Sequence, residues 1–280
     1  MQKKNRQVKR IIDTWSPIGH SVVCPKHGPF VDIKRHCHNI ARFFLASENY
    51  YSSPMYSWFQ IASGIMEVKY ISDLHDDSMF QCNPTIEYED AKSDFHSKLI
   101  RELTIFNFIW GGFESYCDTY PFSPCPAEKR RGSVNAVNHF LKSVYLDNYP
   151  EIQFYDEVIE HFKKIIGKNP WHGKPNELFS SDACTSYKIS GLKAVYKIRN
   201  SFAHGALKFS EPDGWSDVKP YDIGIINISS RILLMTMQMI LLSRPCNLKL
   251  KVSQLHESAE FGVSAEKYLP KLHLKSFKHS

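Results

Sequence analysis

Three polar side chains near residue 200 have the types and spacing that RNA phosphodiester chemistry uses. Arg199, Asn200 and His204 lie within six residues, in the string RNSFAH. An arginine can hold a phosphate group through two parallel hydrogen bonds. A histidine can take or give a proton near neutral pH. Asn200 and His204 are four residues apart, so on a helix they share one face.

The residues before this group predict the helix that positions it. Ile189, Leu192 and Tyr196 follow a spacing of three to four residues, which predicts a helix over about 186–204. Val195, Ile198 and Phe202 widen its apolar face. Arg199 continues the same spacing and is therefore expected on the apolar face. An arginine there needs a partner, which can be a carboxylate, a carbonyl, a phosphate or a facing subunit.

The pattern Arg-Asn-x-x-x-His, at the end of a helix and followed by Gly, resembles the signature of the HEPN superfamily in its Arg-x4-His form. Members of that family are small helical bundles. Many are metal-independent endoribonucleases of toxin–antitoxin, abortive-infection and other phage-defence systems, and others have lost catalysis and serve as binding modules. The resemblance spans about residues 93–245. It implies that Arg199 and His204 are the catalytic pair with Asn200 beside them, and that two copies of the motif meet across a homodimer.

The residues after the histidine differ from one branch of this family. In that branch a tyrosine stands two positions after the histidine and is modified by a nucleotidyltransferase antitoxin, whereas Gly205 and Ala206 follow His204 here. That regulation is therefore not expected. A structural interpretation also stays open, because Arg and His stabilise the C-terminal end of a helix dipole and Gly ends a helix. The full string and its helical context favour the functional interpretation.

The composition is that of a folded globular protein with one large or two modest domains. The chain has 280 residues, of which 42% are hydrophobic and 13% aromatic. Its net charge of +6 permits RNA as a partner without requiring it. Seven cysteines are scattered without paired spacing, and there is no signal peptide, which predicts free thiols in a reducing cytoplasm.

One stretch has about the length of a membrane span. Residues 223–242 are almost entirely apolar or neutral. Asn227, Arg231 and Gln238 interrupt the stretch, so we expect a buried core helix and no contact with a membrane.

The periodicity of apolar residues predicts an all-α fold after residue 90. The predicted helices cover 93–119, 134–145, 152–166, 186–204 and 221–243. The first ninety residues are less regular, with short strands expected within 20–34. We therefore divide the chain into three predicted segments. They are a mixed N-terminal extension of unknown role over 1–90, a HEPN-like bundle over 91–245, and a basic C-terminal tail over 246–280.

A second group of residues offers metal ligands. Cys24, His27, His36, Cys37 and His38 lie within fifteen residues. Zinc sites use four ligands, usually as two close pairs. Cys24 and His27 form one pair with ordinary spacing, whereas His36 and His38 form a less usual one. We expect a loop with scattered ligands, and no cofactor, in preference to a zinc-containing nucleic-acid-binding protein.

Glu114 is a further candidate for the site. It lies on the predicted helix 93–119, four residues after Trp110. A carboxylate on an apolar face is costly unless it has a partner, so Glu114 is a candidate to pair with Arg199 or to orient His204. A surface glutamate near a helix end explains the position equally well.

These features together predict an all-α HEPN-like bundle that acts as a metal-independent endoribonuclease. The family resemblance implies that the RNA 2′-hydroxyl attacks the adjacent phosphorus and leaves a 2′,3′-cyclic phosphate. In that mechanism His204 would serve as general base or acid, Arg199 would stabilise the charged phosphoryl group, and Asn200 would orient the phosphate or His204. The expected partners are RNA, a second copy of the chain, and an antitoxin or regulatory protein. The main alternative is a catalytically silent HEPN-like interaction or RNA-binding module.

Overall fold

The described part of the chain is all-α. The computed structural model describes residues 28–46, 54–75, 83–126, 132–167, 175–179, 185–205, 209, 211–212, 222–244 and 265–275. Across these ranges the secondary structure is helical, and the only pairing of extended backbone is an isolated antiparallel bridge between Phe30 and Leu274. The all-α prediction is confirmed. No strand forms in residues 28–34, and the rest of the stretch expected to hold strands lies outside the described residues.

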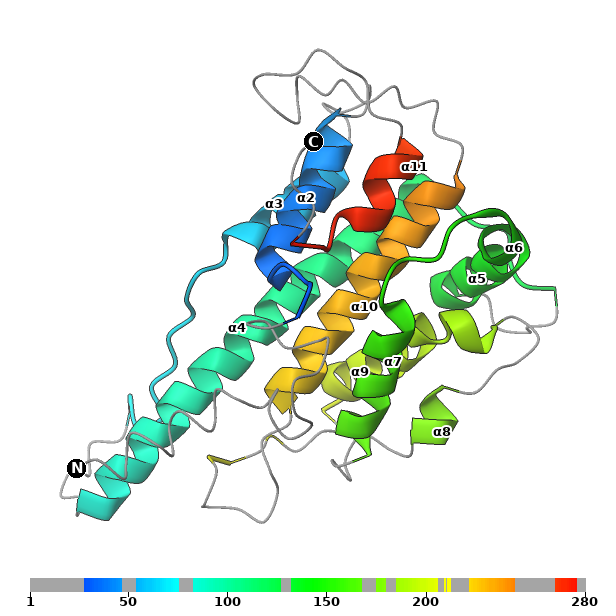
Figure 1. Ribbon diagram of the computed structural model, residues 1–280. Helices are drawn as coiled ribbons and strands as arrows, with labels where there is room; N and C mark the ends of the chain where they lie inside the picture. The colour runs from blue at the N-terminus through cyan, green and yellow to red at the C-terminus, as the bar shows by residue number, and fades with distance from the viewer. Residues whose placement is uncertain are drawn as a thin grey trace.

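The helices surround one central helix, α10, which runs from Asp222 to Ser243 (Figure 1). The others are α2 (Ile33–Ala46), α3 (Pro54–Gly64), α4 (Asn83–Thr119), α5 (Ser133–Phe140), the π-helical turn η3 (Leu141–Tyr145), α6 (Leu146–Asn148), α7 (Tyr155–Ile166), α8 (Pro175–Leu178), the 3-10 turn η5 (Tyr187–Ile189), α9 (Gly191–Ala203), α11 (Ala265–Tyr268) and the 3-10 turn η7 (Leu269–Lys271).

Helix α10 is buried on nearly every side. It packs against α2, α4, α7, α9 and the η7 turn, so an apolar surface all around the helix is covered by protein. Among the described helices it is the one long and apolar enough to cross a membrane, and 94% of its most apolar window is buried inside the structure. A helix that is hydrophobic all round belongs either in a core or in a membrane, and here the neighbouring helices supply the core.

The longest helix, α4, supplies one wall of the bundle. It begins at Asn83, about ten residues before the predicted start. The first fully buried side chain on α4 is Phe95, so its initial turns have no apolar pattern from which they could have been predicted. It ends at Thr119, just before Pro121, which cannot continue a helix.

The described parts of the N-terminal and C-terminal segments share the core of the bundle. Asp32 caps α2 by accepting a hydrogen bond from the Arg35 backbone N–H at 2.8 Å. Helix α2 then packs on α3 and α10, α3 packs on α4, and the η7 turn packs on α10 (Figure 1). One hydrophobic core extends from Phe30 to Leu274. The expected boundary at residue 90 falls inside α4, and the described residues on either side of it belong to one packed unit.

A chain of buried hydrogen bonds joins α2, α10 and the C-terminal segment. Arg231 Nη1 lies 2.8 Å from His36 Nδ1, and Gln238 Oε1 lies 2.9 Å from His36 Nε2. The Gln238 amide also donates to the Leu269 carbonyl and lies 3.2 Å from His273 Nδ1. His273 Nε2 lies 2.9 Å from the Gln153 carbonyl oxygen. All four linked side chains are buried.

The donors and acceptors of this chain fix its protonation. Arginine only donates, so His36 accepts at Nδ1 and donates its Nε2–H to Gln238. The Gln238 amide then donates to His273 Nδ1, which leaves the His273 Nε2–H for the Gln153 carbonyl. Every link is satisfied with both histidines neutral. Burial agrees with this assignment, because it lowers the pKa of His36 well below its ordinary value and lowers the pKa of His273 to about 3.

Replacing Gln238 with Met should therefore destabilise the protein strongly. The substitution leaves the His36 Nε2–H, the Leu269 carbonyl and His273 Nδ1 buried without partners, at a cost of about 3 to 5 kcal/mol in the free energy of unfolding. Chemical denaturation measures it. Gln60→Met, on the exposed face of α3, is the matched control and should change the same quantity by less than about 0.5 kcal/mol. Equal effects of the two substitutions would contradict the role given to Gln238.

The buried histidines should also make stability depend on pH. Below about pH 6.5 the unfolded chain protonates its histidines, whereas folded His36 and His273 stay neutral because their pKa values are depressed. The free energy of unfolding should thus fall as the pH drops from about 6.5 to 5, by up to about 1.4 kcal/mol per pH unit for each histidine.

Denaturation at several pH values tests this slope. In His273→Gln the amide can still accept from Gln238 and donate to Gln153, so the fold should persist while the slope decreases by up to about 1.4 kcal/mol per pH unit. His75→Gln replaces an exposed histidine and should leave the slope unchanged. A slope that His273→Gln does not alter would contradict the neutral, buried state of that histidine.

Candidate functional site

Helix α9 carries the motif residues and is anchored by its apolar stripe. Its buried positions are Gly191, Leu192, Ala194, Val195 and Ile198, and they follow helical spacing. The first turn packs very closely, because a Cβ atom on Gly191 would lie 2.5 Å from the Tyr155 hydroxyl and 2.7 Å from Ile232. Only glycine fits at this contact with α7 and α10, and it fixes where α9 starts.

The buried stripe is rotated away from Arg199. The sequence placed Tyr196 and Arg199 on the apolar face, but Tyr196 is 40% exposed and Arg199 is half-buried at the rim. Val195 and Ile198, which the sequence placed on the same apolar face, are buried as expected. A guanidinium at the rim of the helix stays hydrated, so Arg199 does not need a facing subunit as its partner. The argument for a dimer from the cost of a buried charge therefore does not apply.

The guanidinium of Arg199 lies over an aromatic ring of α4. Its central carbon is 5.6 Å from the centroid of the Trp110 ring, and Trp110 in turn stacks on Tyr196 with centroids 6.1 Å apart. Arg199 Nη1 donates to Asn200 Oδ1 at 3.3 Å. A cation over a tryptophan face is held in place without using its N–H groups. Among the described residues, Asn200 is the one hydrogen-bond partner of this side chain, so most of its five donors remain available.

His204 ends the helix with an exposed side chain. Its backbone N–H donates to the Asn200 carbonyl at 2.9 Å, and the Gly205 N–H donates to the Phe202 carbonyl at 3.1 Å. Gly205 has φ of +64°, the left-handed conformation that terminates helices. The structural interpretation of these residues as a C-terminal cap is thus correct for the backbone. The His204 imidazole has no hydrogen-bond partner within the described ranges, so the cap does not use its chemistry.

Glu114 does not meet the motif. Its exposed side chain lines a shallow depression between α3 and α4, together with Trp58 and Asp118. Its carboxylate has no ion-pair or hydrogen-bond partner among the residues that the structure describes. Arg199 meets the Trp110 ring, one helical turn before Glu114, and not this carboxylate.

The metal-ligand candidates are not gathered in the part that is described. Cys24 and His27 lie outside the described residues. Both ring nitrogens of His36 are in hydrogen bonds, Cys37 is fully buried, and His38 lies on a different face of α2. Burial also raises the pKa of the Cys37 thiol, which disfavours the thiolate that binds metals. Across the described ranges, no group of three or more His, Cys, Asp or Glu side chains could hold a metal ion.

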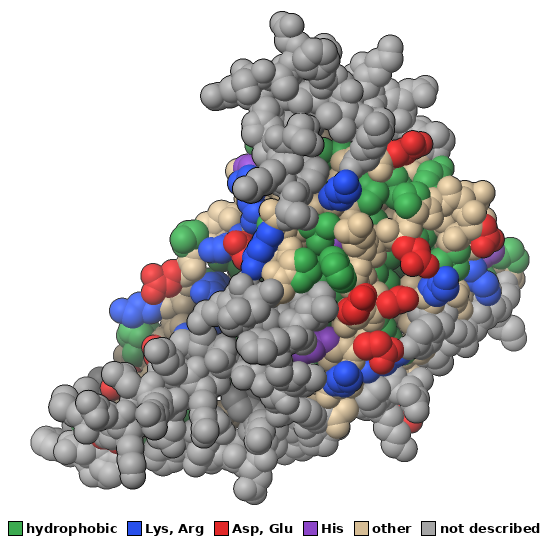
Figure 2. Space-filling model, in the orientation of Figure 1, with side chains coloured by type: hydrophobic (Ala, Val, Ile, Leu, Met, Phe, Trp, Pro, Cys, Tyr) green, Lys and Arg blue, Asp and Glu red, His purple; other side chains and the backbone are tan. Residues whose placement is uncertain are grey.

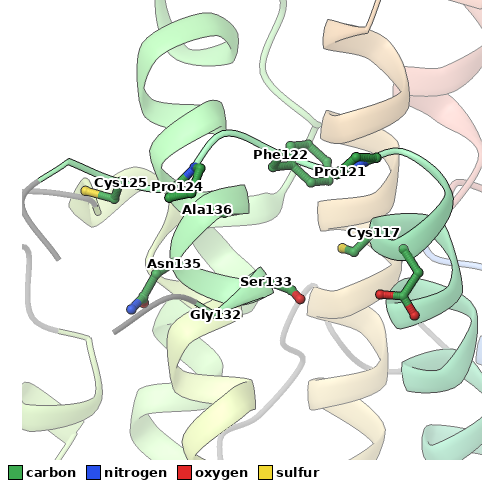
Figure 3. Close-up of a pocket in the computed structure, with 10 residues that line it drawn as sticks. Cys117, Pro121, Phe122, Pro124, Cys125, Gly132, Ser133, Asn135 and Ala136 are labelled. Atoms are coloured by element: carbon green, nitrogen blue, oxygen red, sulfur yellow. The ribbon is translucent and has the colours of Figure 1, made fainter. Parts of the chain in front are cut away.

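A pocket of about 380 Å³ lies away from the motif, between the end of α4 and the start of α5 (Figure 3). Cys117 and Cys125 lie at opposite ends of the group of lining residues. Burial raises the pKa of the Cys117 thiol to about 12, so this thiol is not a nucleophile near neutral pH. Cys125 is disulfide-bonded, so the prediction of free thiols throughout the chain is wrong at this position.

Charge is distributed unevenly over the helices near the motif. Helix α9 carries Lys193, Lys197 and Arg199 and no acidic residue. In contrast, acidic side chains gather over α7 and the loop before it (Figure 2), where Glu151, Asp156, Glu157 and Glu160 are exposed. Burial and the neighbouring Glu151 and Glu157 raise the pKa of Asp156. A polyanion would therefore be attracted to α9 and repelled by the outer face of α7.

Comparison with known proteins does not identify a family for this chain. No family model, no curated protein and no solved structure matches this chain. The HEPN resemblance therefore rests on the motif residues of α9 alone.

Sequence reasoning missed Trp110 and Tyr196 as neighbours of the motif. Trp110 entered only as part of an apolar repeat, and Tyr196 was placed on the buried face. The signal for Tyr196 was its position three residues before Arg199 and between two lysines. The link to Trp110 has no local signal, because that ring comes from α4.

Gly205→Ala tests the cap. A Cβ atom at this position meets no other atom within 4 Å, so the cost is the left-handed backbone alone, about 1 kcal/mol in the free energy of unfolding. Gly64 ends α3, also has open space around it, and has no positive φ. Gly64→Ala should therefore be neutral or slightly stabilising. Thermal unfolding of both variants measures the difference, and a loss of stability confined to Gly64→Ala would contradict the assigned geometry.

Proposed function

We propose that this protein is a metal-independent endoribonuclease of the HEPN type, whose site lies at the C-terminal end of α9. The observation that carries the proposal is that Arg199 and His204 share this helix end while neither side chain is consumed by the fold. Arg199 is held by the Trp110 ring and keeps most of its N–H donors. The His204 side chain is exposed to solvent.

Arg199 has the properties needed to bind the scissile phosphate. Its planar guanidinium can donate two parallel hydrogen bonds to phosphate oxygens and can stabilise the charge that develops on them during the reaction. The Trp110 ring holds the guanidinium from one side. Asn200 accepts one hydrogen bond from Arg199, which orients the fork further and leaves the Asn200 amide N–H groups available for a phosphate oxygen.

His204 supplies the proton chemistry. A base removes the proton of the RNA 2′-hydroxyl, the 2′-oxygen attacks the phosphorus, and the bond to the 5′-oxygen breaks. An acid protonates that leaving oxygen, so the products are a 2′,3′-cyclic phosphate and a 5′-hydroxyl. A neutral imidazole can act as the base, and an imidazolium can act as the acid.

Among the described residues, His204 is the one histidine at the end of α9, whereas the reaction uses a base and an acid. A homodimer with the two α9 ends facing each other would supply both, because a two-fold interface brings each surface patch against its copy. The His204 side chain is exposed and Arg199 lies half-buried at the rim of α9, so both can face a second chain. The family resemblance implies the same composite site, a toxin or phage-defence role in the cytoplasm, and an antitoxin or regulatory protein as a restraining partner.

The second candidate function is a catalytically silent interaction or RNA-binding module. The observation that favours it is the cap, because His204 and Gly205 already have a structural role at the helix end. The two candidates predict different results for the same variants.

The test is cleavage of single-stranded RNA by the purified protein in the presence of EDTA. Wild type should cleave and leave 2′,3′-cyclic phosphate ends. His204→Ala should lower the rate about 100- to 10,000-fold, because it removes the acid–base group. Arg199→Lys keeps the charge but loses the planar fork, so we expect a loss of about 10- to 100-fold. His75→Ala removes an exposed histidine elsewhere and should cleave like wild type.

Thermal unfolding of each variant separates loss of activity from loss of fold. RNA binding without cleavage by wild type would support the silent module. Wild-type rates for folded His204→Ala would contradict the catalytic assignment. Mixing inactive Arg199→Ala with inactive His204→Ala tests the composite site, since a mixed dimer can recover activity only when the two chains share it.

A further inference from the structure

Tyr196 presents an aromatic ring beside the proposed phosphate-binding arginine. It is 40% exposed, whereas the Trp110 ring beneath it is only 4% exposed. The two rings are stacked, with an interplanar angle of 19°. Arg199 lies over the same Trp110 ring. Trp110 thus holds a tyrosine and an arginine from one helix side by side.

This arrangement gives Tyr196 a fixed orientation without burying it. Tyr196 and Arg199 are three residues apart, so their side chains neighbour each other on the helix at about 5–6 Å between Cβ atoms. Contact with Trp110 restricts the side chains of both. The exposed tyrosine is therefore already positioned, and binding a flat ligand would cost it little conformational entropy.

The charge on α9 selects the kind of flat ligand. Lys193 precedes Tyr196 by one turn, Lys197 follows it directly, and no acidic residue lies on the helix. The Lys197 ammonium donates to the Glu177 carbonyl, which is a neutral group. A polyanion with aromatic faces fits this surface, and single-stranded nucleic acid has both properties.

We propose that Tyr196 is a stacking platform for one unpaired base of the RNA, with the adjoining phosphate on Arg199. This inference rests on the proposed function and names its substrate class. A base in a duplex is already stacked and paired, so it cannot reach the ring, whereas a single-stranded base can. The substrate is therefore single-stranded RNA, and Tyr196 positions the nucleotide next to the scissile bond without itself taking part in the proton transfers.

The experiment measures binding of a fluorescently labelled single-stranded RNA by anisotropy, in a His204→Ala background so that the RNA stays intact. Tyr196→Leu keeps apolar bulk but removes the ring, and should weaken binding about 10-fold. Tyr196→Phe keeps the ring and should bind like the parent. Tyr120 is 38% exposed and contacts Tyr116 on α4, away from α9, so Tyr120→Leu is the matched control and should leave binding unchanged.

A second measurement varies the RNA instead of the protein. Removing single bases in turn should identify one position whose loss weakens binding by the parent but not by Tyr196→Leu. The same sequence in a hairpin stem should bind more weakly than the single strand. This measurement does not depend on the stability of any substitution at residue 196.

The outcomes separate this inference from the proposed function. RNA binding that depends on the ring of Tyr196, without cleavage by wild type, would support the platform and overturn the endoribonuclease. Cleavage by wild type with equal binding by the Leu and Phe variants would overturn the platform alone. Absence of RNA binding in wild type and in every variant would overturn both.

Discussion

The arrangement of the helices depends on the buried hydrogen bonds that link Arg231, His36, Gln238 and His273. An arginine and two histidines can lie in an apolar core only when each donor meets an acceptor. That requirement fixes the positions of α2 and of the C-terminal segment along α10. With α10 held there, its other faces receive α4 and α7, and the close contact at Gly191 sets α9 between them. The position of the motif therefore depends on packing against a central helix that this polar network holds in place.

The sequence predicted those features of the fold that depend on local pattern. Apolar periodicity identified α4, α7, α9 and α10, and prolines and glycines placed their C-terminal ends within a few residues. It did not predict the first turns of α4, which have no buried face, or the inclusion of the terminal segments in one core. The contacts that join the terminal segments to the core are between residues far apart in the chain, such as His36 and Gln238. Such pairs produce no periodic pattern in the sequence.

At the candidate site, the sequence placed Arg199, Asn200 and His204 on the last turns of a helix, and α9 carries them there. It predicted one broad apolar face and could not tell which edge of that face is exposed. Packing on α10 buries Val195 and Ile198 and leaves Tyr196 and Arg199 at the rim, beside Trp110. The structural and functional interpretations of the motif also turn out to be compatible. The backbone of residues 200–205 ends the helix, whereas the side chains of Arg199 and His204 are not needed to do so.

The bridge between Phe30 and Leu274 has a consequence for the order in which the protein can fold during synthesis. Residues near the N-terminus leave the ribosome first, yet Asn39 obtains its acceptor, the Leu272 carbonyl, only when residue 272 has emerged. Until then α2 can pack its apolar face but cannot satisfy its buried amide. The core thus closes only after residues 265–275 have been made. A product truncated before residue 265 would lack the groups that complete it and would be recognisable to quality-control proteases.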